Sequence, residues 1–349
     1  MKRIFLTLAV AASVLIGCQQ NGQDSVLPTQ EAIDMSDFYV ETDVHESRGG
    51  SEQCHSMRVL NKQLKENPGL YKKMYDVEYA TRKFLAGKKG GGGNGNGGGG
   101  NTGGGGGGTT PDNLGVVNIP VYVHVVYSNS QQNISDAQIA SQMTVLNDDF
   151  RKQNSDAGNT PSEFAGVAAD AEITFSLAGT FRHSNSTSSW GTNNAVKSAY
   201  PPVTPATHLN IWVANIGGGI LGYAQFPGGS SATDGVVCSP QYFGTTGYVS
   251  APFNGGRTMT HEVGHYLNLR HIWGDGRCRQ DDFVADTPSS DAPNYGCPSY
   301  PTVNCRSNDM TMNYMDYTDD ACMSMFSEGQ KSRMRAIFAS GGPRASMLN

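Results

Sequence analysis

The chain has 349 residues, a formal net charge of −6 at pH 7 and a pI near 5.7. This length accommodates one enzyme domain of about 240 residues and a smaller N-terminal region. The acidic balance, without basic runs apart from lysines beside a glycine-rich stretch, argues against nucleic-acid binding. Seven cysteines fit an exported protein in an oxidising compartment.

Residues 1–17 have the layout of a bacterial signal peptide. Basic residues at the start precede an apolar run from Ile4 to Ile16, which is shorter than the roughly 20 residues of a transmembrane helix. The sequence Leu15-Ile16-Gly17-Cys18 resembles a lipoprotein signal, which predicts cleavage before Cys18 and attachment to a membrane through its lipid. The alternative is an ordinary secretory signal in which Cys18 is incidental. The predicted location is the bacterial envelope, at the cell surface or outer membrane, with release of the C-terminal domain as a further option.

Residues 18–86 form an N-terminal region whose apolar residues between Ser56 and Leu85 recur at near-helical spacing. Asn67-Pro68-Gly69 interrupts this pattern, so a helical hairpin is expected. Residues 87–110 predict a flexible linker that spans about 25 Å, because most residues from Gly90 to Gly108 are glycine. The linker is either a hinge that lets the N-terminal region reach the rest of the chain or a spacer lost on processing. The catalytic domain is assigned to residues 111–349.

Within this last region several elements are predicted from local pattern. Val116 to Tyr127 reads as the first strand, and Leu209 to Val213 is apolar and β-branched enough for another. A helix is expected from Ile134 to Asn154, with Ser135 as its N-cap. Gly217 to Gly219 indicates either a close backbone approach or a simple loop.

The segment HEVGHYLNLRH carries the chemistry. On a helix His261 and His265 share one face and can bind a single metal, while Glu262 lies beside the metal and can accept a proton from water. A catalytic zinc needs a third protein ligand, which His271 supplies if the helix ends and the chain turns back near Asn268. Asparagine tolerates the left-handed conformation that such a turn requires. The alternative is a helix with two solvent-facing histidines and no metal.

This segment resembles the metzincin metalloproteases, as does Asn313 to Tyr317, which resembles their Met-turn. The finer match is to the pappalysin (cytophagalysin) family and covers most of residues 114–340. One departure is Asn268, where the family usually has glycine. The matching segments are LNIWVANIGGGILGYAQFP, GRTMTHEVGHYLNLRHIWGD, DDFVADTP, NYMDYTDDACM and FSEGQKSRM.

The resemblance implies an α+β, metzincin-like fold: a twisted mixed sheet with two long helices, a backing helix and an active-site helix, and an irregular C-terminal subdomain. It also implies that the region from Leu209 ends a sheet whose exposed edge binds an extended peptide. Glu262 would be the general base and acid, and Tyr317 would hydrogen-bond the oxyanion, the alternative being a packed core tyrosine. Met315 would form a hydrophobic floor below the metal. The implied zinc ligands are His261, His265 and His271.

Cysteines have further implied roles. With Cys18 lipidated, six cysteines remain, which allow fifteen pairings. For the four cysteines that follow the metal motif, a second zinc site is the alternative to disulfides. These cysteines lack the short CxxC spacing that such sites usually have. The resemblance implies the disulfides Cys278–Cys305 and Cys297–Cys322.

Cys54 lies just before the predicted hairpin. Latent metzincins often use a cysteine of the pro-region as a temporary zinc ligand that excludes water, and thiolate sulfur is a good zinc ligand. The alternatives for Cys54 are a disulfide with Cys238 and a free thiol.

Two acidic segments suggest further sites. Asp282, Asp286 and Thr287 offer hard oxygen ligands close together, which together with the resemblance suggests a structural Ca²⁺, the alternative being a solvated loop. Asp319 and Asp320 follow the Met-turn, where the resemblance implies the pocket for the residue after the scissile bond. An acidic pocket would favour Arg or Lys there, unless both carboxylates face solvent.

The sequence therefore predicts a Zn²⁺-dependent endopeptidase that hydrolyses polypeptides through a metal-activated water, with Glu262 as base. It would be made as a secreted or envelope-anchored zymogen and act as a monomer. One alternative is a non-catalytic, zinc-containing surface lipoprotein that binds a partner, against which the presence of Glu262 argues. Another is a zinc amidase acting on cell-wall peptides.

Overall fold

A mixed five-stranded sheet supports the metal motif in the computed structural model, which describes residues 32–42, 53–89 and 112–348. The strands lie in the order β2-β1-β3-β5-β4, and all neighbouring pairs are parallel except β4 with β5. The sheet is thus mixed, as predicted. The strands are β1 (Val117–Tyr127), β2 (Ile173–Ser184), β3 (Leu209–Ala214), β4 (Gly222–Ala224) and β5 (Val236–Cys238).

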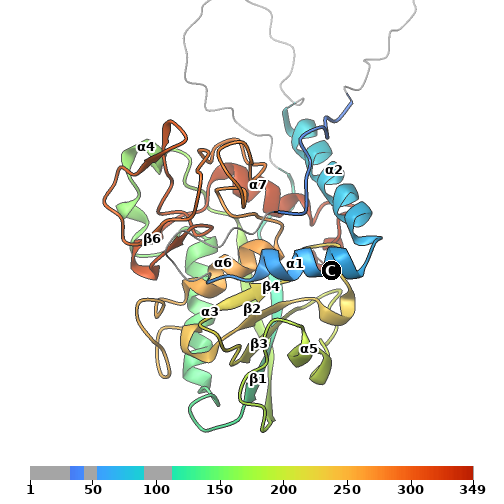
Figure 1. The fold of residues 1–349 in the computed structure, drawn as a ribbon, viewed down its shortest axis with the longest axis vertical. Helices are drawn as coiled ribbons and strands as arrows, with labels where there is room; N and C mark the ends of the chain where they lie inside the picture. The colour runs from blue at the N-terminus through green and yellow to red at the C-terminus, as the bar shows by residue number, and fades with distance from the viewer. Residues whose placement is uncertain (1–31, 43–52, 90–111, 349) are drawn as a thin grey trace, which may run out of the picture. The chain divides into compact units, whose positions relative to one another are not determined.

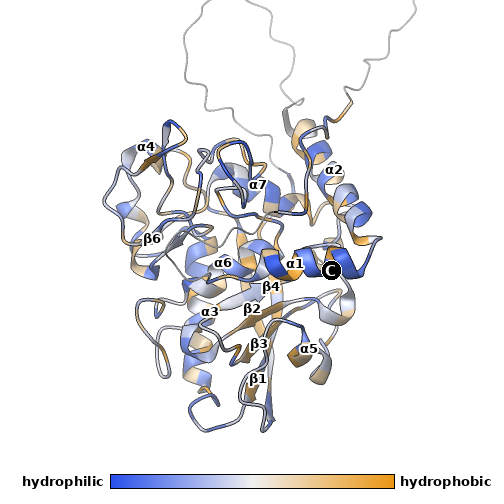
Figure 2. Cartoon of the chain, viewed as in Figure 1, coloured by the Kyte–Doolittle hydropathy of each residue, from blue (hydrophilic) through white to orange (hydrophobic). Residues whose placement is uncertain are grey.

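The central strands are buried on both faces. Every residue of β3 is buried, which is the pattern expected when helices cover both sides of parallel strands. Figure 2 shows these strands toward the hydrophobic end of the colour scale. The predicted strands at Val116–Tyr127 and Leu209–Val213 are confirmed. The expectation that the region from Leu209 ends the sheet is right only for its downstream part, because β3 is internal and β4 forms the edge.

Helices cover the two faces of the sheet unequally. The helices α3 (Asp136–Phe150) and α6 (Arg257–Tyr266) share one hydrophobic core with β1, whereas α5 (Ala195–Ala199) contributes Val196 to a separate core on Trp212 of β3. Figure 1 shows α3 and α5 on either side of the strands. These two core helices agree with the predicted pair, although α6 has only 10 residues.

The predicted N-cap of α3 is confirmed, since the Ser135 hydroxyl accepts a hydrogen bond from the backbone N–H of Gln138. The helix ends at Phe150, earlier than the predicted Asn154. Lys152 has a φ of +51°, a left-handed conformation that a continuing helix does not allow.

The chain after α6 has little regular structure. Disulfides join Cys278 to Cys305 and Cys297 to Cys322, so both implied pairs are confirmed. The helix α7 (Glu328–Ala336) closes this region with a capping box formed by Ser327 and Gln330. The short elements are α4 (Ser162–Ala165), β6 (Tyr295–Gly296), β7 (Val303–Asn304), β8 (Ser307–Asn308), β9 (Tyr317–Thr318), and the 3-10 turns η1 (Ala157–Asn159), η2 (Ser231–Thr233), η3 (Pro240–Tyr242), η4 (Asp320–Cys322) and η5 (Ala345–Leu348).

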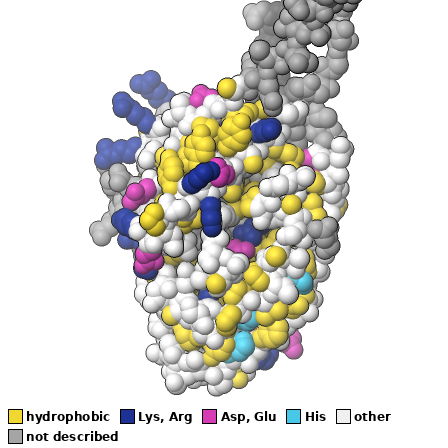
Figure 3. All heavy atoms as spheres, turned by 90° about the vertical axis from the view of Figure 1, so that its right-hand side faces the viewer, with side chains coloured by type: hydrophobic (Ala, Val, Ile, Leu, Met, Phe, Trp, Pro, Cys, Tyr) yellow, Lys and Arg dark blue, Asp and Glu magenta, His cyan; other side chains and the backbone are white. Residues whose placement is uncertain are grey.

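The N-terminal region forms the predicted hairpin, with α1 (Ser56–Glu66) and α2 (Leu70–Lys89) separated at Asn67 to Gly69. The helix α2 continues three residues past the predicted boundary at residue 86. The described residues from 35 onward form one compact unit, so the hairpin and the sheet belong together. Figure 3 views the side on which the hairpin lies and shows hydrophobic side chains among Lys and Arg.

The predicted signal peptide, Cys18 and most of the predicted linker lie outside the described residues. Among the described residues, no helix is both long enough and apolar enough to cross a membrane.

Candidate metal centre

Three histidines converge at the C-terminal end of α6. His261 and His265 lie one helical turn apart, and Asn268 then adopts a left-handed φ of +78°, which turns the chain back toward His271. The Nε2 atom of His265 lies 3.1 Å from the Nε2 atoms of both His261 and His271. Two nitrogens bound to a tetrahedral zinc at about 2.0–2.1 Å lie about 3.3 Å apart. The histidine arrangement therefore fits this metal, and the predicted turn at Asn268 is confirmed.

The other ring nitrogen of each histidine is also engaged. His261 Nδ1 lies 2.7 Å from the carbonyl oxygen of Tyr314, and His265 Nδ1 lies 2.8 Å from that of Leu269. A carboxylate oxygen of Asp275 contacts His271 Nδ1. Nδ1–H groups that donate to these oxygens leave the Nε2 lone pairs directed at the shared point.

Burial favours the neutral form of the first two histidines. It lowers the pKa of His261 to about 3 and lowers the pKa of His265 well below its usual value. A neutral imidazole is the form that binds a metal. These side chains are therefore ready to bind a metal at neutral pH without first losing a proton.

Replacing Asp275 with asparagine should weaken metal binding about tenfold, because an amide supports the orientation of His271 less strongly than a carboxylate does. Asparagine also tolerates the φ of +58° at this position, so the backbone should be retained. Competition with a chelator measures the affinity. Asp76→Asn, at an exposed ion pair on α2, is the control and should leave the affinity unchanged. Equal affinities of the Asp275 variant and the unmodified chain would refute the positioning role.

Glu262 lies beside the histidines on α6 and is fully buried. Burial raises the pKa of its carboxyl to about 7, while hydrogen bonds from Ser56 and Cys54 act in the opposite direction. The edge strand approaches it so closely that a Cβ atom on Gly222 would lie 2.9 Å from Glu262 Cγ. A side chain at position 222 would therefore displace Glu262.

Met315 packs against the other side of the metal helix. A Cβ atom on Gly264 would lie 2.4 Å from the sulfur of Met315, so the HEVGH helix needs glycine at this point. Met315 is fully buried, and its carbonyl oxygen accepts a hydrogen bond from Ile272 N, next to the third histidine. This is the position expected for a hydrophobic floor.

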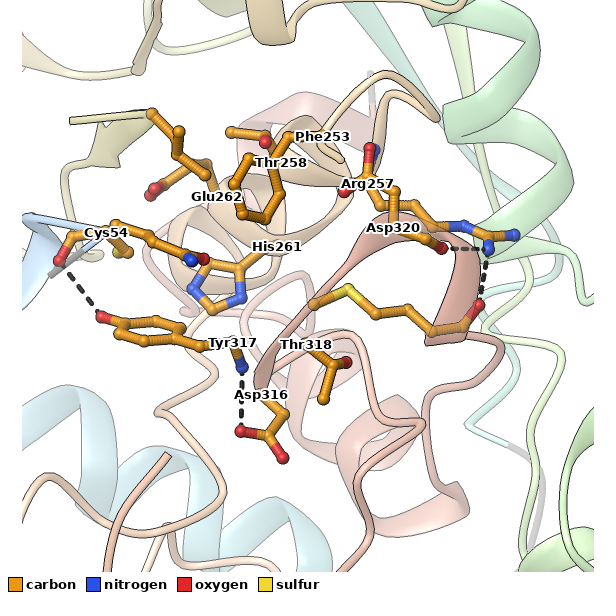
Figure 4. Close-up of a pocket in the computed structure, with 13 residues that line it drawn as sticks. Cys54, Phe253, Arg257, Thr258, His261, Glu262, Asp316, Tyr317, Thr318 and Asp320 are labelled. Atoms are coloured by element: carbon orange, nitrogen blue, oxygen red, sulfur yellow. Dashed lines mark hydrogen bonds between the residues drawn. The ribbon is translucent and has the colours of Figure 1, made fainter. Parts of the chain in front are cut away.

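Tyr317 lies at the site as well. Its ring centroid is 5.7 Å from that of His261 and 5.0 Å from that of His271. Its hydroxyl donates to the carbonyl oxygen of Cys54 across 3.2 Å, as the dashed line in Figure 4 shows. The ring of Tyr317 is thus part of the main core, while its hydroxyl contacts the N-terminal region beside the histidines.

Cys54 completes the cluster. Its sulfur and the three histidine nitrogens all lie within 4.8 Å of one another, and no other group of this kind occurs in the described part of the chain. Cys54 and Cys238 are both buried free thiols, so the disulfide between them does not form. The structure therefore brings a thiol to the fourth side of the histidine site.

The backbone around Cys54 extends the sheet. Gln53 and His55 exchange hydrogen bonds with the edge strand, from Leu221 N to Gln53 O at 2.9 Å and from His55 N to Gly222 O at 3.1 Å. Cys54 and Gly222 form a parallel bridge. The N-terminal region thus occupies the edge of β4 as an added strand.

Ser56 is a site residue that sequence reasoning missed. Its hydroxyl donates to Glu262 Oε2 at 2.7 Å and accepts from Ala224 N at 2.7 Å. No local pattern distinguishes this serine from others, because its partners lie more than 160 residues away. Glu262 is therefore covered by the same segment that carries Cys54.

The candidate calcium ligands separate into two places. The Thr287 hydroxyl donates to both carboxylate oxygens of Asp282 at 2.9 Å. Both oxygens of Asp286 instead accept hydrogen bonds from the start of α7, from the Ser327 hydroxyl at 2.6 Å and from Gly329 N at 2.8 Å. The structure pairs Asp282 with Thr287 and directs Asp286 toward α7, and the calcium site stays a prediction.

Of the two aspartates after the Met-turn, Asp320 reaches the site. It lines the same pocket as His261 and Glu262, which Figure 4 shows. Its Oδ2 accepts hydrogen bonds from the backbone N–H of Gly255 and Arg257 at 2.7 and 3.2 Å, and burial raises its pKa to about 6. Asp320 therefore places an acidic group in the pocket beside the metal site, and does not face solvent.

Two histidines on a helix and a third after a tight turn, with a glutamate beside them and a methionine turn below, define a metallopeptidase of the metzincin type. Residues 204–339 match the model of the M43 peptidase family, described as "Pregnancy-associated plasma protein-A". An extracellular metalloprotease of Pyricularia oryzae is 34% identical over 237 residues, which are 64% of this chain and 75% of that protein. The extracellular metalloprotease 1 of Coccidioides posadasii is 33% identical over 64% of this chain and 77% of its own length.

Solved structures of similar proteins point to the same family. Mature mirolysin of Tannerella forsythia, in complex with a cleaved peptide, is 47% identical with a TM-score of 0.65, covering 67% of this chain and 96% of that one. A mutant of promirolysin from the same organism is 39% identical with a TM-score of 0.72, covering 85% of this chain and 97% of that one. This chain belongs to the pappalysin family of metzincin metalloproteases and is a metalloendopeptidase.

Proposed function

We propose that this protein is a zinc-dependent endopeptidase that is exported and made as an inactive precursor. The observation that carries the proposal is the convergence of three histidines, with His265 Nε2 3.1 Å from each of the other two Nε2 atoms, beside the buried carboxylate of Glu262. When bound, zinc supplies a Lewis acid that polarises the scissile carbonyl and brings the pKa of a bound water toward neutrality. The donor set of imidazole nitrogens suits this metal.

Two side chains act on the substrate: Glu262 transfers protons, and Tyr317 stabilises negative charge. Glu262 takes the proton of the attacking water and passes it to the leaving amine, for which a buried carboxyl with a raised pKa is suited. The Tyr317 hydroxyl, once it is no longer bonded to Cys54 O, donates to the oxygen of the scissile carbonyl as negative charge develops there. The edge of β4 binds the substrate backbone as an added strand, since the N-terminal segment already pairs with it in this way.

Latency follows from the same contacts. The sulfur of Cys54 would provide the fourth ligand and exclude water. The Ser56 hydroxyl hydrogen-bonds Glu262, and the Tyr317 hydroxyl hydrogen-bonds the carbonyl oxygen of Cys54. The likeness to promirolysin, which covers more of this chain than the likeness to mature mirolysin does, supports residues 18–86 as a pro-region. Each group that would perform catalysis is therefore engaged by Cys54 or Ser56 of this pro-region.

Export is supported by the signal-like sequence and by relatives that are named extracellular metalloproteases. The sequence before Cys18 favours lipid attachment there, which would hold the precursor at the bacterial envelope. For the substrate, Asp320 in the pocket favours Arg or Lys after the scissile bond by charge. The structural Ca²⁺ suggested for Asp282, Asp286 and Thr287 rests on the sequence and the family resemblance alone.

The test uses residues 111–349 with a peptide mixture derived from a proteome, analysed by mass spectrometry. We expect internal cleavages, enriched in Arg or Lys after the cut, which disappear when a chelator removes zinc and return when zinc is restored. Absence of any cleavage by the zinc-loaded protein would favour the non-catalytic binding lipoprotein. Cell-wall peptides are incubated in parallel, and cleavage confined to them would favour the amidase.

A further inference from the structure

The pro-region contacts the catalytic domain at a second place, remote in sequence from Cys54. Glu78, in the middle of α2, accepts hydrogen bonds from Arg333 of α7 at 3.1 and 2.5 Å, and another from Arg82 of its own helix at 2.8 Å. Glu78 and Arg333 are each 2% exposed, so this is a buried ion pair and not a surface contact. Figure 1 shows α2 next to α7.

One residue, Asn268, connects this ion pair to the metal site. The Nε atom of Arg333 donates to the carbonyl oxygen of Asn268 at 2.8 Å. The side chain of Asn268 in turn lies 3.5 Å from the Thr81 hydroxyl, one helical turn after Glu78. Asn268 is the left-handed residue that turns the chain from His265 to His271, so α2 holds the metal-binding turn from outside the cleft.

The catalytic domain places two buried arginines here, with Asp275 as the acidic neighbour of Arg270. Arg270 is buried between the rings of Tyr39 and Phe283, at 4.4 and 4.6 Å, and Arg333 lies 5.5 Å from the Phe283 ring. Nη1 of Arg270 finds no hydrogen-bond partner among the described residues. Glu78 therefore brings a carboxylate to a pair of buried arginines.

Glu78 is ionised at neutral pH. Burial by itself would raise its pKa, but the charge and hydrogen bonds of Arg333, with those of Arg82, lower the pKa of Glu78 to about 2. The charged groups that face it are Arg333 from α7 and Arg82 from α2, with Arg270 near Arg333. The pair is consequently intact at neutral pH.

We propose that Arg270 and Arg333 form an anion-binding surface beside the metal-binding turn, and that Glu78 occupies it as a second anchor of the pro-region, independent of Cys54. The partner that fits this surface is a carboxylate on a helix, with an aromatic ring stacked on Arg270, as Tyr39 provides. The proposal rests on the proposed function only in assigning the turn to a metal site. Loss of the metal-ligand contact at Cys54 should then leave α2 bound.

Hydrogen–deuterium exchange of the full chain, in a Glu262→Ala background that prevents self-cleavage, tests this independence. Glu78→Gln should raise amide exchange in α2 at least tenfold, because an amide leaves Arg333 without a charged partner. Cys54→Ala should leave α2 as protected as in the parent chain. Glu66→Gln, at an exposed pair on α1, is the matched control and should change nothing in α2.

Three results would overturn the proposal. Unchanged protection of α2 in Glu78→Gln would show that the carboxylate is not an anchor. Equal opening of α2 in Cys54→Ala would show that the two contacts are one unit. Lost protection of β1 and β3 in Glu78→Gln would show that this residue serves the fold of the catalytic domain instead. Because the background protein is inactive, failure of the peptide-cleavage test would leave these results standing.

Discussion

Replacing Glu262 with alanine is expected to abolish peptide cleavage while zinc remains bound. Glu262 is not among the three histidines whose Nε2 atoms converge, so its loss leaves the ligand set complete. General acid–base catalysis by a positioned side chain contributes roughly 10²- to 10⁴-fold, and we expect a loss of kcat of about this size. The measurement compares cleavage rates and zinc content of residues 111–349 with and without the substitution.

The matched control for this variant is Glu163→Gln. Glu163 is an exposed glutamate of the same domain that accepts hydrogen bonds from Tyr300 and Asn308, outside the metal site. It should retain the rate of the unmodified protein. Cleavage by Glu262→Ala at more than a few per cent of the wild-type rate, with zinc present, would remove Glu262 from its proposed role. Loss of zinc together with activity would instead make it a structural part of the metal site.

The second large effect is expected for Cys54→Ala in the full chain. This change removes the sulfur that lies within 4.8 Å of the histidine nitrogens and admits water to the fourth position. Activity of the full chain should appear at least tenfold faster than in the unmodified precursor. Cleavage of a peptide substrate over time measures this rate. The small side chain of alanine leaves the strand pairing with β4 in place, so the effect reports on the sulfur.

Cys238→Ala supplies the control for this prediction, because Cys238 is the other buried free thiol among the described residues but does not belong to the metal-binding group. It should remain as latent as the unmodified chain. If Cys54→Ala matures no faster than the wild type, the cysteine is not what keeps the precursor inactive. The hydrogen bond of Ser56 to Glu262 would then be the next contact to remove.

Cys54→Ala and Glu78→Gln together separate the contributions of the two anchors. If Glu78 holds α2 independently, the pro-region of Cys54→Ala stays on the catalytic domain while the metal site is already open. Activity would then precede release of the pro-region. A precursor with two separate contacts can respond to two separate events, processing of the chain and displacement of the sulfur.

Features set by local periodicity could be predicted from the sequence alone. The four-residue spacing places His261 and His265 on one face of a helix, and the tolerance of asparagine for a positive φ places the turn at Asn268. The alternation of β1 and the N-cap of α3 are similarly local, and both are found where the pattern predicts them. The disulfide pairing was accessible through the family resemblance, not through spacing.

Features that depend on contacts between distant segments needed the tertiary structure. The end of α3 at Phe150, the internal position of β3, the hydrogen bonds of Asp286 to α7 and the contact of Ser56 with Glu262 are of this kind. So is the path from Glu78 through Arg333 to Asn268. The sequence by itself determined which residues can bind a metal, because helical spacing is local. Only the folded chain decided what covers them, because that depends on which distant side chains pack together.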